Sequence, residues 1–229
     1  MENNVIIALD FASKEEMFDF LRPFKEYKPY VKVGMEMFYK EGPEVVRELK
    51  KQGFHIFLDL KLCDIPNTVK MAMAKLGSLG VDIINLHAFG GIEMMKAARA
   101  GLDMTEEGKK TKLIAVTVLT SVNEDVLKNE LLIDHDVQDV VRKYAENAKE
   151  AGLDGVVCSA LEAKIIKDMG LISVTPGIRL LGDSKDDQKR VATPSLAKEL
   201  GATYIVVGRS ITKSDDPVKA YLKCVEEFR

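Results

Sequence analysis

The stretch "FHIFLDLKLCDIPNT", residues 54–68, has the alternating pattern of a β-strand but carries charges on one of its two faces. An isoleucine and three leucines occupy every second position, as expected for a strand with one face in a core. The opposite face brings Asp59 and Lys61 to the end of the strand, and Asp64 follows. Ionised groups at nearly buried positions cost several kcal/mol unless they are paired. The stretch therefore predicts a strand that presents a functional charge cluster at its carboxyl end.

The composition is that of an ordinary globular protein. The chain has 229 residues, of which 46% are hydrophobic and 30% charged, enough for one large core. The net charge is −3 and both signs are interspersed, so no nucleic-acid partner is expected. No apolar stretch approaches the ~18 residues of a membrane span, and the opening "MENNVIIALD" lacks the features of a signal peptide. A membrane partner is therefore not expected.

The cysteines predict neither a disulfide framework nor a metal site. Cys63, Cys158 and Cys224 are few and widely separated, and with only three histidines in the chain no zinc-like spacing occurs. We expect no metal and a reducing cytoplasmic location, and we assign these cysteines no role.

Short β-branched runs alternate with amphipathic stretches along the whole chain, and no Pro/Gly/Ser-rich linker interrupts them. The runs predict strands over residues 4–10, 30–35, 55–61, 81–87, 112–119, 153–159, 171–177 and 203–209. Eight strand–helix units in this length match a single (β/α)₈ TIM barrel, which typically needs about 250 residues. An open doubly wound sheet is the alternative, but no GxGxxG motif follows the first strand. We therefore predict one domain spanning residues 1–229.

Catalytic residues of such barrels lie at the carboxyl ends of the strands. The residues with suitable chemistry at these ends are Asp10, Lys32, Asp59, Lys61, Asp64, His87, Thr120, Arg179, Gly208 and Arg209. Taken singly, an aspartate there is more often a helix cap, a lysine usually reaches water, and His87 is more often a hydrogen-bonded residue than a base. Two lysines and three aspartates together instead predict a network of alternating charges, which is how buried ions become tolerable.

A phosphate site is predicted at the ends of the seventh and eighth strands, where barrels commonly bind phosphate. Gly208 allows close approach of the backbone, and Arg179 and Arg209 supply two guanidinium groups. The polar stretch 179–194 between these strands is a candidate lid, and it contains Gln188, which can both donate and accept hydrogen bonds. A plain surface loop is an equally good interpretation of its composition.

At these residues the sequence resembles the orotidine 5′-monophosphate decarboxylase family in its bacterial form. "DLKLCDIPNT" matches the DxKxxD segment of that family. The segments that continue the match are "IIALDFAS", "VKVGMEMFYKEGP", "VTVLTS", "TPGIR", "DQKRVATP", "IVVGRSIT" and "DPVKAY". DxKxxD alone is shared with related barrels, but all segments in order, over essentially the whole chain, are highly specific.

The resemblance implies a homodimeric barrel that converts orotidine 5′-monophosphate to UMP and CO₂, the last step of UMP biosynthesis, with no cofactor. It implies that Lys61 donates a proton to C6 of the pyrimidine and that Asp59 lies beside the carboxylate of the substrate. It further implies that Lys32 and Asp10 contact the ribose and that Asp64 and Thr68 contribute to the neighbouring subunit's site. Thr120 would contact the pyrimidine, and Gln188 would bridge base and phosphate. The implied phosphate-binding residues are Arg179, Gly208 and Arg209.

Two other functions remain open. A Mg²⁺-dependent sugar-phosphate decarboxylase or synthase of the same superfamily would also carry DxKxxD, but usually with a glutamate at the position of Lys32, where a lysine would repel the metal. A non-catalytic barrel that binds a phosphate ligand would have no reason to keep the charge array.

Overall fold

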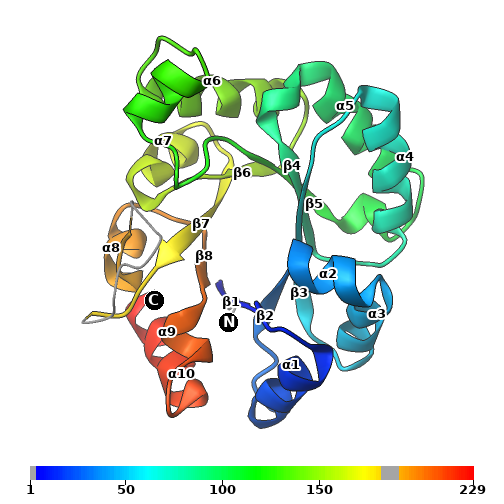
Figure 1. The fold of residues 1–229 in the computed structure, drawn as a ribbon, viewed down its shortest axis with the longest axis vertical. Coiled ribbons are helices and arrows are strands. Elements are labelled where there is room, and N and C mark those ends of the chain that lie inside the picture. The colour runs from blue at the N-terminus through cyan, green and yellow to red at the C-terminus, as the bar shows by residue number, and fades with distance from the viewer. Residues whose placement is uncertain (1–3, 182–190) are drawn as a thin grey trace.

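Eight parallel strands close into a barrel in chain order, and β1 pairs with β8 to complete it. This arrangement comes from a computed structural model that describes residues 4–181 and 191–229, with the helices forming an outer ring around the strands (Figure 1). The strands are β1 (Val5–Ala8), β2 (Tyr30–Gly34), β3 (His55–Leu62), β4 (Ile83–His87), β5 (Lys112–Val116), β6 (Gly155–Val157), β7 (Ile172–Ile178) and β8 (Tyr204–Val207). The predicted (β/α)₈ barrel and all eight predicted strands are confirmed, with ends that differ by a few residues.

Helices follow the strands as the amphipathic stretches predict. They are α1 (Lys14–Leu21), α2 (Met35–Glu41), α3 (Glu44–Lys51), α4 (Pro66–Gly77), α5 (Gly91–Leu102), α6 (Val137–Glu150), α7 (Ala163–Asp168), α8 (Pro194–Glu199), α9 (Arg209–Thr212) and α10 (Pro217–Glu227). Short 3₁₀ turns lie at Arg22–Phe24, Ala88–Gly90, Gly108–Lys110 and Ala160–Glu162, and a π turn lies at Val126–Glu130. No helix of the described ranges is long and apolar enough to cross a membrane.

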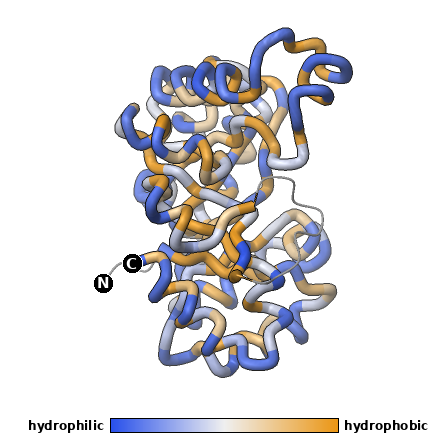
Figure 2. Tube along the Cα trace, turned by 90° about the vertical axis from the view of Figure 1, so that its left-hand side faces the viewer, coloured by the Kyte–Doolittle hydropathy of each residue, from blue (hydrophilic) through white to orange (hydrophobic). Residues whose placement is uncertain are grey.

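The core has two layers, because successive residues of each strand point to opposite faces. In β3, Ile56 and Leu58 belong to the large layer between strands and helices, whereas Phe57 belongs to the smaller cluster inside the barrel. In Figure 2 the strands at the centre are largely orange, and blue segments concentrate along the outer helices and loops. Asp59 and Lys61 are in phase with Phe57, so β3 directs them toward the barrel interior at its carboxyl end.

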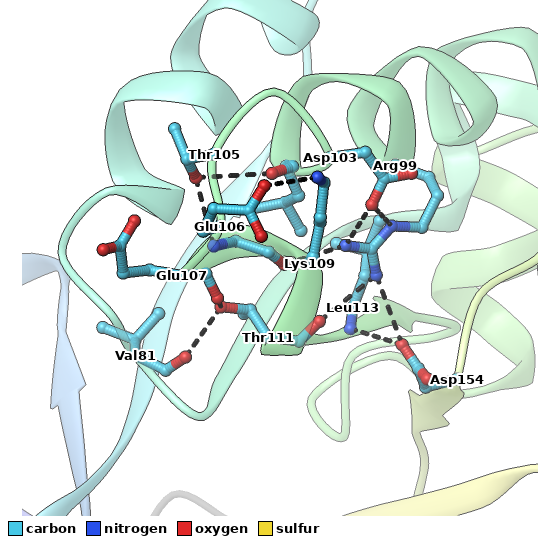
Figure 3. A network of polar contacts seen from close by, with 12 residues as sticks. Val81, Arg99, Asp103, Thr105, Glu106, Glu107, Lys109, Thr111, Leu113 and Asp154 are labelled. Atoms are coloured by element: carbon cyan, nitrogen blue, oxygen red, sulfur yellow. Dashed lines mark hydrogen bonds and ion pairs between the residues drawn. The ribbon is translucent and has the colours of Figure 1, made fainter.

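The amino ends of the strands carry a separate polar network, shown in Figure 3. Arg99 of α5 donates to the carbonyl oxygens of Gly108 at 3.0 Å and Thr111 at 3.2 Å, and its Nε donates to Asp103 at 3.1 Å. Asp154, whose carboxylate lies 3.6 Å from Arg99, accepts the Leu113 N–H at 2.8 Å. This network fastens α5 and the start of β5 to each other, at the end of the barrel opposite the predicted site.

Candidate active site

Asp59 is the centre of a chain of alternating charges. It is 8% exposed, and its Oδ1 accepts a hydrogen bond from the Lys61 ammonium at 2.6 Å. Its Oδ2 lies 3.5 Å from Nζ of Lys32, which in turn donates to Oδ1 of Asp10 at 3.0 Å. Three strand ends thus bring together four of the predicted site residues, in the order Asp10, Lys32, Asp59, Lys61. Each buried charge has an opposite charge beside it, which is the condition for tolerating them.

The pKa values of Asp59 and Lys32 shift in the direction that keeps both groups ionised. Burial would raise the pKa of Asp59, but the positive charges of Lys32 and then Lys61 outweigh burial and lower it. Burial would likewise lower the pKa of Lys32, but the carboxylates of Asp10 and Asp59 raise it. The charges of Asp59 and Lys32 therefore persist at neutral pH.

A bulge in β3 places Lys61. Leu58 pairs with Ile84 and Leu62 with Leu86, so three residues of β3 lie opposite the single residue Asn85 of β4. Within the bulge Lys61 has a φ of 51°, the left-handed region, which for a residue other than glycine costs of order 1–3 kcal/mol. Bulges commonly re-aim a side chain next to an active site, and this one aims the Lys61 ammonium at Asp59.

Gly34 leaves room for the middle of the charge chain. It lies two residues after Lys32 in β2 and pairs with Asp59 across the sheet. A Cβ atom at this position would lie 3.1 Å from Nζ of Lys32 and 3.4 Å from Oδ1 of Asp10. The missing side chain therefore allows the lysine to sit between its two carboxylates.

A pocket of about 190 Å³ opens beside the charge chain. Its polar side consists of Lys32, Asp59, Lys61 and Thr120; its apolar residues are Phe57, Val116, Val118, Leu119, Val157, Cys158, Val174, Pro176 and Val206. An apolar wall weakens dielectric screening and so strengthens the field of the charges. A larger hollow of about 710 Å³ lies at the amino ends of β1 and β8, but no member of the charge chain lines it.

The predicted phosphate residues follow two paired strand ends. Ile178 of β7 pairs with Val207 of β8, so Arg179 comes directly after one paired position and Arg209 follows the other by two residues, after Gly208. Nη1 of Arg179 donates to the carbonyl of Ile178 at 3.1 Å, whereas its buried Nε has no hydrogen-bond partner among residues 4–181 and 191–229. Gly208 caps α9, which begins at Arg209. Gln188 lies outside the described residues.

The comparisons with known proteins agree with this geometry. A model of the family described as "Orotidine 5'-phosphate decarboxylase / HUMPS family" matches residues 3–224. The chain belongs to this family. It is 54% identical over 233 residues to a protein of Bacillus pumilus (strain SAFR-032) named orotidine 5′-phosphate decarboxylase, with 100% of both chains covered. It also resembles the crystal structure of orotidine 5′-phosphate decarboxylase from Lactobacillus acidophilus, with a TM-score of 0.89, 41% identity and full coverage of both chains.

Two residues that the resemblance to the orotidine 5′-phosphate decarboxylase family singles out lie apart from the charge chain. Asp64 is exposed in the loop after β3, where its Oδ1 accepts the N–H of Ile65 at 2.6 Å. Thr68 is exposed in the first turn of α4. Among the described residues, Asp64 forms no ion pair with Lys61 of its own chain.

Asn85 is a site residue that sequence reasoning missed. It is fully buried in β4 and contacts both Asp59 and Lys61. The available signal was one amide within the apolar run "IINLH". His87 ends the same strand half-buried, where burial and then the charge of Lys61 lower its pKa, against the opposing effect of Asp59. In residues 4–181 and 191–229 no group of three or more His, Cys, Asp or Glu side chains could hold a metal ion.

Proposed function

We propose that this single (β/α)₈-barrel domain, residues 1–229, is an enzyme that decarboxylates orotidine 5′-monophosphate to UMP and CO₂, the last step of UMP biosynthesis. The observation that carries the proposal is the Lys61 ammonium, held 2.6 Å from Asp59 beside a largely apolar pocket. Membership of the family and the 54% identity to a full-length relative of that name support it. We further propose that the reaction needs neither a metal nor an organic cofactor.

The chemistry explains why an ammonium is needed at this place. When the bond between C6 and the carboxylate breaks, CO₂ leaves and its electron pair stays on an sp² carbon that has no resonance sink. In our proposal the Lys61 ammonium stabilises this developing charge through a fixed electrostatic interaction. It then transfers a proton to C6, which yields UMP and a neutral amine that regains its proton from water.

Asp59 has two effects of unequal size in this scheme. It holds Lys61 charged and oriented, and it repels the carboxylate of the substrate. Unit charges ~4 Å apart at an effective dielectric of ~20 interact by about 4 kcal/mol. Enzymes commonly lower barriers by about 8–23 kcal/mol, so repulsion is at most a partial cause. Stabilisation of the transition state by Lys61 must therefore dominate.

We assign phosphate binding to Arg179, Gly208 and Arg209, with Gln188 as the lid residue that bridges base and phosphate. The buried Nε of Arg179 has no partner in the part of the chain that the structure describes, which supports a ligand at this place, because buried donors normally have an acceptor. Phosphate is remote from C6, so its binding energy can drive closure and exclusion of water. Asp10 and Lys32 are assigned to the ribose and Thr120 to the pyrimidine.

The position of Lys32 argues against a Mg²⁺-dependent reaction. Its ammonium lies 3.0 Å from a carboxylate oxygen of Asp10 and 3.5 Å from one of Asp59, where a divalent cation would otherwise find oxygen ligands. The Lys32 ammonium thus occupies the position between these carboxylates where a divalent cation would bind.

We also propose that two copies share their active sites, with Asp64 and Thr68 of each reaching the other. Exposed apolar side chains at the same end of the barrel support an interface there: Tyr39, Ile65 and Phe89 are each more than two-thirds exposed, at 72%, 68% and 71%. We place the enzyme in the cytoplasm, since Cys158 and Cys224 are buried cysteines that form no disulfide, which suits a reducing compartment.

The deciding experiment mixes the purified protein with orotidine 5′-monophosphate and follows the loss of the orotate absorbance. We expect rapid loss and formation of UMP, unchanged after exhaustive treatment with EDTA. An unchanged absorbance would refute the activity, and loss of turnover on chelation that added Mg²⁺ restores would favour the metal-dependent relatives.

A further inference from the structure

Asn85 makes two hydrogen bonds that require a donor and an acceptor on one side chain. Its Nδ2 donates to Oδ1 of Asp59 at 2.7 Å, and its Oδ1 accepts the backbone N–H of Lys61 at 2.8 Å. A carboxylate only accepts and a backbone N–H only donates, so the orientation of the amide is fixed by its partners. The residue is 0% exposed; its bond to Asp59 is buried, and its bond with the Lys61 N–H is partly buried.

These bonds fill the gap that the β3 bulge opens in the sheet. Because three residues of β3 face one residue of β4, the ladder of backbone bonds is interrupted there. The N–H of Lys61, turned by its left-handed conformation, is bonded instead by the Asn85 side chain. A buried N–H normally has a partner, and here the amide of Asn85 is that partner.

The same side chain limits the freedom of Asp59. Its Oδ1 receives the Lys61 ammonium and the Asn85 amide, while its Oδ2 faces Lys32. The carboxylate is therefore held from three directions. Asn85 is the one uncharged residue of these three, and its strand, β4, contributes no residue to the charge chain.

We propose that Asn85 is a positioning residue of the decarboxylation: it fixes the backbone of Lys61 and the carboxylate of Asp59, so that the ammonium meets C6 of the substrate. The inference rests on the proposed function, because it needs Lys61 to be the proton donor. Asn85 acts through Lys61 and Asp59 and does not line the described pocket. Its loss should lower kcat and leave ground-state binding of the nucleotide largely intact.

The first test is Asn85→Leu, which keeps the number and branching of the side-chain heavy atoms but can neither donate nor accept. A displacement of about 1 Å at reacting groups can cost about 100-fold in rate, and we expect a loss of that size in kcat. The dissociation constant of UMP should stay close to that of the wild type. The matched control is Thr111→Val, which removes a buried hydrogen bond to the Val81 carbonyl at the other end of the barrel and should leave kcat unchanged.

The second test, Asn85→Asp, has a readout that a merely structural role would not produce. A protonated Asp side chain can donate to Asp59 and accept from Lys61 as the amide does, whereas the ionised form cannot donate. The charged side chain that contacts position 85 is Asp59 of β3. Asp59 is in turn paired with Lys61 of β3 and Lys32 of β2, and the charges of Asp59 and Lys61 also act on His87 of β4. We expect kcat of this variant to rise as the pH is lowered, relative to the wild type at each pH.

The outcomes separate this inference from the proposed function. If the wild type does not consume orotidine 5′-monophosphate, the proposed function fails first. If the wild type is active and Asn85→Leu retains its kcat, or loses UMP binding in step with kcat, the positioning role is refuted. Should Asn85→Leu not fold, the Asp variant decides: recovery at low pH supports the role, and a profile parallel to the wild type refutes it.

Discussion

Lys61 combines two properties that are rarely found in one residue, a strained backbone and an ammonium fixed at 2.6 Å from a buried carboxylate. Lys61→Ala removes both the proton and the charge that face C6. We expect turnover to be abolished, whereas UMP binding changes by no more than about an order of magnitude, because C6 of the product needs no cation. Single-turnover assays together with titration of UMP check this expectation.

Arg209→Ala is expected to have the opposite effect to Lys61→Ala, on binding rather than on turnover. It removes a guanidinium from the phosphate end of the site, so we expect a severe loss of affinity for UMP. Substantial kcat in Lys61→Ala would show that another group is the acid.

The residues of the charge chain could be predicted because they violate a pattern. Asp59 and Lys61 interrupt an apolar strand, and a charge there needs an explanation. Asn85 could not be predicted in the same way, because its role depends on a bulge in the neighbouring strand and register is not visible in one sequence. Likewise Gly34 matters through a close approach to Lys32 that only coordinates reveal.

At the scale of elements, one carboxylate joins the amino ends of two strands to a helix. Asp82, just before β4, accepts the Ile56 N–H of β3 at 2.8 Å and the Lys50 ammonium of α3 at 3.0 Å. Its other oxygen lies 3.0 Å from Nδ1 of His55. Burial would raise the pKa of Asp82, but the bonds from His55, Ile56 and Lys50 outweigh it and lower the pKa. The strand spans could be predicted from periodicity, but the contacts of Asp82 with β3 and α3 could not.

The lowered pKa fixes the sign of a stability prediction. A carboxyl with a depressed folded pKa stabilises the fold above its unfolded value of about 4 and loses that contribution as the pH falls through the folded pKa. Asp82→Asn should therefore cost about 1–3 kcal/mol at pH 7, and the difference from the wild type should shrink in acid. Urea unfolding of both proteins at several pH values measures this. A difference that does not vary with pH would contradict it, and kcat at pH 7 should be unaffected.

At the scale of the whole molecule, stability and chemistry lie at opposite ends of the barrel. The Asp82 contacts and the Arg99 network join elements at the amino ends of the strands, and the charge chain lies at the carboxyl ends. This division is general for (β/α)₈ enzymes. Contacts at the amino ends stabilise the barrel, so the site at the carboxyl ends can hold strained and desolvated groups. The barrel was predictable from eight repeated units, whereas the pairing of two barrels depends on exposed loops without periodicity.

Subunit mixing tests whether the complete site needs two molecules. Asp64→Ala and Lys61→Ala proteins should each be inactive. If Asp64 serves the partner, a heterodimer of the two regains one intact site, formed by the Lys61 of one chain and the Asp64 of the other. Random pairing in a two-fold dimer makes half of the dimers mixed, so we expect about a quarter of the wild-type activity.

The matched control for this experiment mixes Lys61→Ala with Lys32→Ala. Both residues approach Asp59 of their own chain, so no pairing of these subunits restores a site. Recovery with Asp64→Ala but not with Lys32→Ala would therefore assign Asp64 to the neighbouring subunit. Equal failure of both mixtures, with subunit exchange verified by differently tagged chains, would mean that each barrel completes its own site and that Asp64 acts within its own chain.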